Sequence, residues 1–475
     1  MMKKVTILSS FLLVFCFFCL QCYCEDGSME APMEKWEQEA LYFAIQGFVG
    51  NWWNGSDLYP DPCGWTPIQG VSCDLFNGLW HVTELSIGPM HDNSLDCAPN
   101  VTLTPHIFSL KHLKSLSLFN CFTTPLHQPV KIKTEMWETL SGSLESLEFR
   151  SNPGLVGEIP ETFGHLRNLQ SLVLVENGLS GQLPTNLGNL VNLKRLVISG
   201  NRISGEVPNE FGLLKSLLIL DLSRNALDGY VPLGLGGLSS LLKLDLSSNQ
   251  LEGQIPEKLG NLKNLTLVDL SNNIFSGGLT KSLQEINSLE ELVLSNNPTG
   301  GDLMSIKWQN LIGLKVLDLA NMSLTGGIPD SICELKKMRF LGLNDNKLTG
   351  EISPKLASLP NVSAIYLNGN NLTGELKFSE VFYGKMGRRF GAWNNSNLCY
   401  QIMLKSAINI PFGIRPCGVG DATIDELSPL QESNFGSENW MNKKSHSTAS
   451  LRIVTYGFRF MTLLEILIFV VAFIL

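Results

Sequence analysis

Apolar residues recur along most of the chain with a period of 24 or 25 residues. From Leu144 onward the pattern is regular, and five segments superpose without gaps: LQSLVLVENGLSGQLP, LKRLVISGNRISGEVP, LLILDLSRNALDGYVP, LLKLDLSSNQLEGQIP and LKVLDLANMSLTGGIP. In each segment the apolar fourth and sixth positions flank one variable residue, which is the alternation of a short β-strand. Weaker copies around Val82 and Leu113 come first. The pattern therefore predicts twelve turns of a solenoid, each adding one strand to a parallel sheet.

An asparagine recurs at one position of this period, and Met322 occupies the position where it is skipped. Because an amide side chain has donors and an acceptor, stacked asparagines can satisfy turn backbone groups inside the solenoid. The following glycine permits a tight turn, and the proline of GxIP fixes φ and begins a new segment. We expect these residues to hold the coil together rather than to bind a ligand. The recurring asparagines are Asn152, Asn177, Asn201, Asn225, Asn249, Asn273, Asn297, Asn346 and Asn370.

The consensus LxxLxLxxNxLxGxIP is the leucine-rich repeat pattern. The wording GxIPxxLGxLxxL, as in GEIPETFGHLRNL at 157–169, resembles the plant-specific class, and DPCGWTPIQGVSCD at 61–74 resembles the cap of that class. The resemblance implies an α/β leucine-rich repeat solenoid. We expect a curved, twisted horseshoe of about 12 plant-type repeats between disulfide-bonded caps, with the parallel sheet on its concave face.

The strand residues that point away from the core are the expected place for function. Four aspartates share one position of the period, which would suit a basic ligand. They also belong to the recurrent wording LDLS, so a solvated face without a binding role is the simpler interpretation. The candidate ligand-binding residues are Lys194, Val197, Asp221, Asp245, Asp269, Asp318, Arg339 and Tyr366.

The cysteines predict a disulfide framework at the two ends of the solenoid, where exposed core needs a cap. We expect the pairs Cys63–Cys73, Cys97–Cys121 and Cys399–Cys417, which leave Cys333 as a buried thiol. Glycans are expected at the Asn-x-Ser/Thr sequons. These are Asn54, Asn100, Asn264, Asn321, Asn361, Asn371 and Asn394.

Both ends of the chain indicate the secretory pathway. Residues 1–24 have the short basic region and apolar run of a signal peptide. We then expect an N-terminal cap at 25–81, repeats at 82–390, a C-terminal cap at 391–420 and a flexible stalk at 421–447. Residues 448–475 are either the propeptide of a glycosylphosphatidylinositol signal, with Ser447 as the lipidation site, or a C-terminal membrane helix. Secretion without an anchor is the third possibility, and no cytoplasmic signalling domain is expected.

Composition and motifs exclude several function classes. The chain has 35 Lys+Arg against 44 Asp+Glu, a formal charge of −9, and no basic run of the kind that binds nucleic acid. It has no phosphate loop, nucleophile elbow or HExxH motif, and its seven histidines have no metal or triad spacing. We therefore expect no enzymatic activity, no cofactor and no metal site.

The motifs together resemble plant receptor-like proteins that carry leucine-rich repeats and no kinase. One member of this class is associated with growth promotion by a root-colonising fungus. The resemblance implies a recognition or co-receptor component at the extracellular face of the plasma membrane. Its ligand would be a protein, peptide or glycan, and its partner a receptor kinase. A secreted inhibitor similar to polygalacturonase-inhibiting protein is an alternative, and a structural wall glycoprotein lacks the expected proline-rich tract.

Overall fold

The computed structural model describes residues 32–89, 95–99, 101–123, 129–401 and 411–418. The chain divides into two compact units, Met1–Gly418 and Val419–Leu475, and all described residues belong to the first. The predicted signal peptide, stalk and C-terminal anchor lie outside the described residues. Within the described part, no helix combines the length and apolar character needed to cross a membrane.

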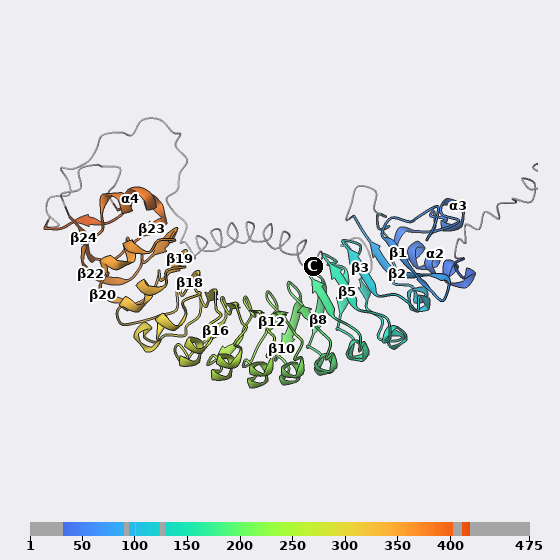
Figure 1. The fold of residues 1–475 in the computed structure, drawn as a ribbon, viewed down its shortest axis with the longest axis horizontal. Coiled ribbons are helices and arrows are strands. Elements are labelled where there is room, and N and C mark those ends of the chain that lie inside the picture. Colours follow the sequence, from blue (N-terminus) through green and yellow to red (C-terminus); the bar gives the residue numbers. More distant parts are fainter. Residues whose placement is uncertain (1–31, 90–94, 100, 124–128, 402–410, 419–475) are drawn as a thin grey trace, which may run out of the picture. The chain divides into compact units, whose positions relative to one another are not determined.

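One long sheet runs through the first unit, along the inner side of its coils (Figure 1). Its strands pair in parallel register, except that β1 and β2 are antiparallel. Twelve described strands, β2 to β21 in this sheet, correspond to the twelve predicted turns, so the predicted solenoid is confirmed. In order, the strands are β1 (Val71–Phe76), β2 (Leu79–Ile87), β3 (Ser115–Phe119), β5 (Ser146–Arg150), β7 (Ser171–Val175), β9 (Arg195–Val197), β11 (Ile219–Asp221), β13 (Lys243–Asp245), β15 (Leu267–Asp269), β17 (Glu291–Val293), β18 (Val316–Asp318), β19 (Phe340–Gly342), β21 (Ala364–Tyr366) and β23 (Phe390–Gly391).

The outer side of the coils is built from short 3-10 helices. Prolines at the N-cap positions of six of these helices, such as Pro208 and Pro256, have φ between −60° and −72°, the value to which the proline ring restricts the backbone. The GxIP motif therefore marks the start of each helix. The described helices are η1 (Pro105–Ser109), η2 (Trp137–Leu140), η3 (Glu161–His165), η4 (Thr185–Asn189), η5 (Asn209–Leu213), η6 (Leu233–Gly237), η7 (Glu257–Asn261), η8 (Lys281–Glu285), η9 (Leu303–Ser305), η10 (Trp308–Asn310), η11 (Asp330–Glu334), η12 (Pro354–Ser358) and η13 (Gly387–Arg389).

Between the main strand and the outer helix, many coils add a strand to a smaller sheet. These strands also pair mainly with the coils before and after them, so the coils are joined along a second line. The irregular span 122–139 contributes β4 and η2 to this arrangement in its described part, which makes it a degenerate turn rather than a loop on the main sheet. The strands are β4 (Val130–Lys131), β6 (Leu155–Gly157), β8 (Gly178–Gly181), β10 (Arg202–Gly205), β12 (Ala226–Leu227), β14 (Glu252–Gly253), β16 (Ile274–Phe275), β20 (Thr349–Glu351), β22 (Asn371–Leu376), β24 (Asn397–Tyr400) and β25 (Arg415–Pro416).

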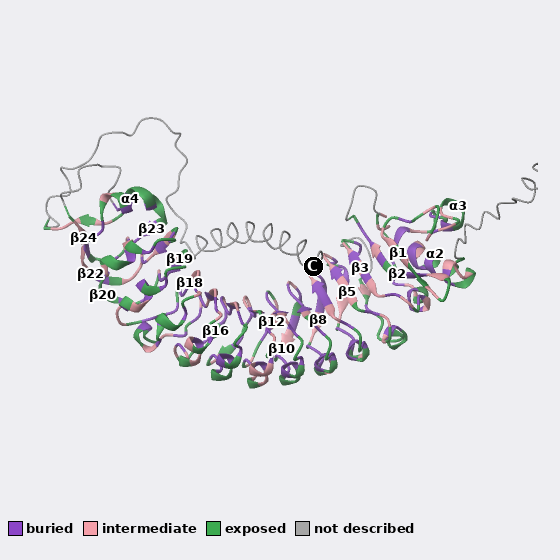
Figure 2. Cartoon of the chain, viewed as in Figure 1, coloured by how far each residue is buried: buried purple, intermediate pink, exposed green. Residues whose placement is uncertain are grey.

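The core is a continuous stack of leucine-type side chains between the sheet and the outer helices. Leu172 and Leu174 of β7 are fully buried, and so are Leu187 and Leu190 from the outer side of the next helical turn. Figure 2 shows this buried interior running through the coils. Burying each such side chain stabilises the fold by about 2 kcal/mol, but a single coil has no neighbour against which to bury it.

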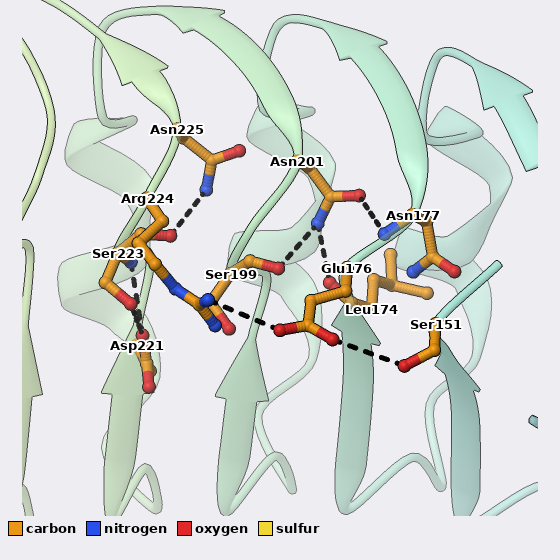
Figure 3. A network of polar contacts seen from close by, with 10 residues as sticks. All are labelled: Ser151, Leu174, Glu176, Asn177, Ser199, Asn201, Asp221, Ser223, Arg224 and Asn225. Atoms are coloured by element: carbon orange, nitrogen blue, oxygen red, sulfur yellow. Dashed lines mark hydrogen bonds and ion pairs between the residues drawn. The ribbon is translucent and has the colours of Figure 1, made fainter. Parts of the chain in front are cut away.

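The recurring asparagines form a ladder of hydrogen bonds between successive coils. Asn201 donates from Nδ2 to the carbonyls of Leu174 at 2.7 Å and Ser199 at 3.1 Å, and its Oδ1 accepts the N–H of Asn177 at 3.2 Å (Figure 3). Asn395 makes the equivalent bonds to Leu367, Ala392 and Trp393. The ladder and the strand β23 therefore continue beyond residue 390, further than the expected end of the repeats.

Helices and disulfides close the two ends of the unit. The helix α2 (Lys35–Val49) buries Leu41, Ile45 and Phe48 over the first coil, and α3 (Gly55–Leu58) follows it. At the other end, α4 (Glu380–Met386) begins at Ser379, whose side chain accepts the N–H of Phe382. The structure forms Cys63–Cys73, Cys97–Cys121 and Cys399–Cys417, and Cys333 is free and buried.

Candidate functional site

Side chains at the same position of successive strands form lines across the inner face of the main sheet. The line at the last position of the three-residue strands, called the middle line here, passes through Val197, Asp221, Asp245 and Asp269, whose Cα atoms are partners in register. It continues through Val293, Asp318 and Gly342 to Tyr366. Six of the eight predicted binding residues therefore share this line, and the exposed Lys194 and Arg339 lie one position before their strands.

The expected exposure of the middle line is wrong for four of these residues. Val197, Asp245, Asp269 and Asp318 are only 6%, 4%, 7% and 8% exposed, respectively. The aspartates are turned toward the end of their own strands, where Ser271, for example, donates its backbone N–H and hydroxyl to Asp269 Oδ1 at 2.9 and 2.6 Å. The LDLS motif thus forms a local turn in which the serine donates hydrogen bonds to the aspartate. This structural role explains why the motif recurs, and no ligand is needed to explain it.

The centre of the face is a compact electrostatic unit. Lys243 Nζ lies 3.5 Å from Asp221 Oδ2 and 3.6 Å from Asp245 Oδ2. Burial, together with the charges of Asp221 and Asp269, raises the pKa of Asp245 to about 7. Burial also raises the pKa values of Asp269 and Asp318. A basic ligand would find these carboxylates already buried and partnered.

The end of the face nearest the C-terminal cap has a different character. The rings of Phe340 and Tyr366 lie side by side with centroids 5.9 Å apart, and both residues are half-buried. Two glycines make room for them. A Cβ on Gly342 would lie 2.9 Å from Phe340 Cε1, and a Cβ on Gly391 would lie 2.9 Å from Tyr366 Cδ1.

Aromatic side chains continue across the cap from this pair. The Cβ position of Gly391 is also 2.8 Å from Trp393 Cζ3, and the ring of Trp393 meets that of Phe412 edge to face at 5.8 Å. The guanidinium of Arg388 lies 5.8 Å from the centroid of Phe412. We call Phe340, Tyr366, Trp393 and Phe412 the aromatic strip. Arg388 lies beside it, and Arg339 directly precedes Phe340 in the sequence.

The strip was only partly predictable. Tyr366 and Arg339 were candidates because they occupy outward positions, but Phe340, Trp393 and Phe412 were not. The available signal was glycine at the variable position of LxL, in the segments LGL at 341–343 and FGA at 390–392. A glycine inside a strand often marks close approach of another group.

The surface around the face is polar. Arg224 Nη1 lies 3.3 Å from Glu176 Oε1, and the hydroxyl of Ser151 donates to Glu176 Oε2 (Figure 3). Six sequon asparagines are exposed: Asn54, Asn264, Asn321, Asn361, Asn371 and Asn394. Asn100 and Ser447 lie outside the described residues. A depression of about 460 Å³, lined in part by Asn394 and Arg415, adjoins the C-terminal cap.

Two family models, both described as leucine rich repeat, match the sequence. One covers residues 191–251, and the other covers 168–190 and 313–335. These stretches coincide with coils of the observed solenoid. The chain is a leucine-rich repeat protein. Its flanking disulfides agree with the secretory pathway, where such bonds persist.

Two curated proteins of Arabidopsis thaliana are similar to parts of this leucine-rich repeat protein. Piriformospora indica-insensitive protein 2 is 63% identical over 151 residues, which are 32% of this chain and 35% of the relative. Receptor like protein 29 is 33% identical over 157 residues, which are 32% of each chain. The matches thus span about a third of either relative. The resemblance inferred from the repeat and cap motifs is confirmed.

Solved receptor ectodomains share the fold. PEPR1 bound to AtPEP1 is 25% identical, with a TM-score of 0.57 over 77% of this chain and 51% of that one. The Arabidopsis receptor kinase HAESA, in complex with the peptide hormone IDA and the co-receptor SERK1, is 26% identical. Its TM-score is 0.53, over 77% of this chain and 70% of that one. The second of these neighbours is thus a receptor kinase in complex with a peptide hormone and a co-receptor.

Proposed function

We propose that this leucine-rich repeat protein is a recognition or co-receptor component at the plant cell surface, and that it binds a partner through the aromatic strip. The partner is an extracellular peptide or the ectodomain of a receptor kinase. The aromatic strip is the observation that carries this proposal, because the middle of the inner face is buried and already paired.

The composition of the strip is that of a binding surface. Tyrosine, tryptophan and arginine are the residues most often found to dominate the energy of protein interfaces. Their large rings bury much apolar area with little loss of side-chain freedom, and they retain polar groups at their edges. Phe412 is 59% exposed, so the strip offers apolar surface that a partner would cover.

The charges beside the strip favour an acidic or neutral partner. Arg339, Arg388 and Arg389 are exposed: Arg388 lies 5.8 Å from the ring centroid of Phe412, the charge of Arg389 acts on Tyr366, and Arg339 directly precedes Phe340 in the sequence. A guanidinium can pair with a carboxylate in two parallel hydrogen bonds, which adds specificity to the apolar contact. The partner we expect therefore combines an apolar side chain with a carboxylate group.

The relatives support a setting for this recognition. The 63% identical relative is named for insensitivity to Piriformospora indica, and we propose a role for this protein in the response to a root-colonising fungus. The HAESA complex contains a peptide hormone and a co-receptor, which supports a partner kinase here. We further propose that residues 1–24 direct export and that the segment 448–475, with Ser447 at its border, attaches the protein to the membrane.

Co-purification from plant root membranes tests the proposal. The tagged full chain would be expressed in roots with and without the fungus, cross-linked at the surface, purified, and analysed for receptor kinases by mass spectrometry. We expect the wild-type protein to recover a receptor kinase. The double variant Arg339→Ala, Tyr366→Ala should recover at least tenfold less, because it removes one ring and one cation from the strip.

A matched double variant controls for loss of a tyrosine and a cation elsewhere. Tyr230 is 63% exposed and Lys258 lies exposed in η7, both away from the main sheet. Tyr230→Ala, Lys258→Ala should behave as the wild type. Equal recovery by the two double variants, or recovery of no receptor kinase by the wild-type chain under either condition, would contradict the proposal.

A further inference from the structure

Three side chains converge where the N-terminal cap meets the first coil. Glu37 comes from α2, His81 from β2, and His112 from the turn before β3. One carboxylate oxygen and one ring nitrogen of each histidine lie within 4.8 Å of one another. Carboxylate oxygen and imidazole nitrogen are ligand types that zinc uses in proteins.

Glu37 is fully buried, so its carboxylate oxygens need polar partners inside the protein. Its Oε1 accepts the backbone N–H of Val82 at 3.0 Å, and its Oε2 lies 2.6 Å from His81 Nδ1. A buried carboxylate is strongly unfavourable without a cation. Either a proton on His81 or a metal ion can supply the positive charge at this point.

His112 provides the feature that distinguishes this cluster from an ordinary ion pair. Its ring lies over that of His81 with centroids 3.9 Å apart. Its Nδ1 is buried and has no hydrogen-bond partner among the described residues. A buried nitrogen without a partner next to a buried carboxylate is the arrangement that a metal ion would satisfy.

The surroundings separate the cluster from other charges. The ring of Phe76 lies 4.5 Å from His112 and 5.8 Å from His81, and forms an apolar wall on one side. The nearby Lys114 is paired with Asp74, with Nζ and Oδ2 2.7 Å apart. The charge of this neighbouring lysine is thus already compensated.

We propose that Glu37, His81 and His112 bind a divalent transition metal ion, and that Zn²⁺ is the ion that best fits them. Two imidazoles disfavour Ca²⁺ and Mg²⁺, which select oxygen ligands. Ligand atoms around tetrahedral zinc are about 3.3 Å apart, so no pair of ligand atoms has to close by more than about 1.5 Å, and the Glu37 Oε2 to His81 Nδ1 distance of 2.6 Å has to open by about 0.7 Å. A water molecule would complete the coordination.

The site would join the cap to the solenoid. The three ligands belong to three separate segments, so one ion would fix α2, β2 and the following turn together. End coils of a solenoid depend on such capping because their outer face has no neighbouring coil. The spacing of histidines along the sequence predicted no metal site, because the cluster forms only when the cap folds onto the first coil.

Zinc titration of the purified full chain tests this inference. The protein would carry no histidine tag, would be stripped with a chelator, and would be titrated with Zn²⁺ against a chromophoric competitor. We expect one equivalent of high-affinity binding and a rise in the thermal unfolding temperature. The variant His112→Gln should bind at least tenfold more weakly, with a circular dichroism spectrum like that of the wild type.

His165 provides the matched control, because its Nδ1 lies 2.5 Å from Glu138 Oε1 in an exposed pair without a second histidine. His165→Gln should bind Zn²⁺ as the wild type does. The inference fails if His112→Gln binds zinc as tightly as the wild type, if the wild type binds no equivalent, or if His165→Gln removes the binding. A variant Glu37→Gln that stays folded should also lose the site.

Discussion

Replacement of Asn249 by leucine is expected to lower the free energy of unfolding by about 3–5 kcal/mol. The Asn249 amide donates to the carbonyls of Leu222, Leu246 and Ser247 at 3.0–3.2 Å, and its Oδ1 accepts the N–H of Leu227 at 3.0 Å. Leucine has nearly the same volume but provides none of these groups. The largest single loss is at Leu227, whose buried N–H would have no acceptor.

The ladder makes this cost larger than that of one hydrogen bond. The carbonyl of Leu246 accepts from both Asn249 and Asn273, so each rung shares its acceptors with the next. Removing one asparagine therefore weakens the contact between two coils, and the stability of a solenoid depends on such contacts between neighbours. Denaturant unfolding followed by circular dichroism measures the change.

The adjacent Gln250 supplies the control for this experiment. It is also an amide, but its side chain is exposed. Gln250→Leu should change the free energy of unfolding by less than about 0.5 kcal/mol. Equal stability of the two variants would contradict the structural role given to the ladder.

The asparagine ladder and the apolar core could be predicted because the same residue type recurs at the same position of many repeats. A leucine at the place of Leu172 or an asparagine at the place of Asn249 recurs in almost every coil, so a single physical explanation must serve them all. The strand β23 and the ladder residue Asn395 were missed because the segment FGAWNNSN departs from the repeat consensus on either side of Asn395. The prediction there depended on the local sequence motif, which is lost, although the backbone continues the geometry of the preceding coils.

The inner face was harder to predict because alternation shows only which way a side chain points. It cannot show that Asp269 is covered by neighbouring coils and held by Ser271. Nor can it show that Gly342 makes room for the ring of Phe340. Both effects depend on how individual side chains pack in three dimensions, which the apolar period of a coil does not show.

The Glu37, His81 and His112 cluster lies beyond sequence reasoning for a similar reason. His81 and Glu37 are 44 residues apart and belong to a strand and a cap helix. No short motif joins them, and only the packing of α2 against β2 brings the carboxylate to the imidazole. Motif searches find sites whose ligands are close in sequence, whereas the three residues of this cluster are far apart in sequence.

The stability of the protein is expected to fall as the pH rises from 5 to 8, and Asp245→Asn should remove much of this fall. The pKa of Asp245 in the folded chain is about 7, above its ordinary value of 3.8. The folded state therefore binds this proton more tightly than the unfolded state does. The resulting stabilisation is complete below pH 3.8 and is lost as the pH rises through 7.

The charges around Asp245 explain the direction and the size. At pH 8 its carboxylate is buried beside Asp221 and Asp269, and the cation paired with it is Lys243, whose Nζ lies 3.6 Å from Asp245 Oδ2. Asparagine keeps the shape and can still accept the N–H and hydroxyl of Ser247, but it carries no charge. We expect Asp245→Asn to be more stable than the wild type by about 2–4 kcal/mol at pH 8, by less than half as much at pH 5, and nearly equal to it only below about pH 4.

Urea unfolding at pH 5, 6, 7 and 8 measures this difference, and Asp228→Asn is the control. Asp228 is exposed on the same coil as Asp221, so its loss should leave the pH dependence of the wild type unchanged. A smaller dependence of the same sign should remain in Asp245→Asn, because burial also raises the pKa values of Asp269 and Asp318. Parallel curves for the wild type and Asp245→Asn would mean that the central carboxylates do not exchange their protons in this range. The charge at the centre of the inner face would then stay constant over this range, whereas the expected result makes it respond to pH.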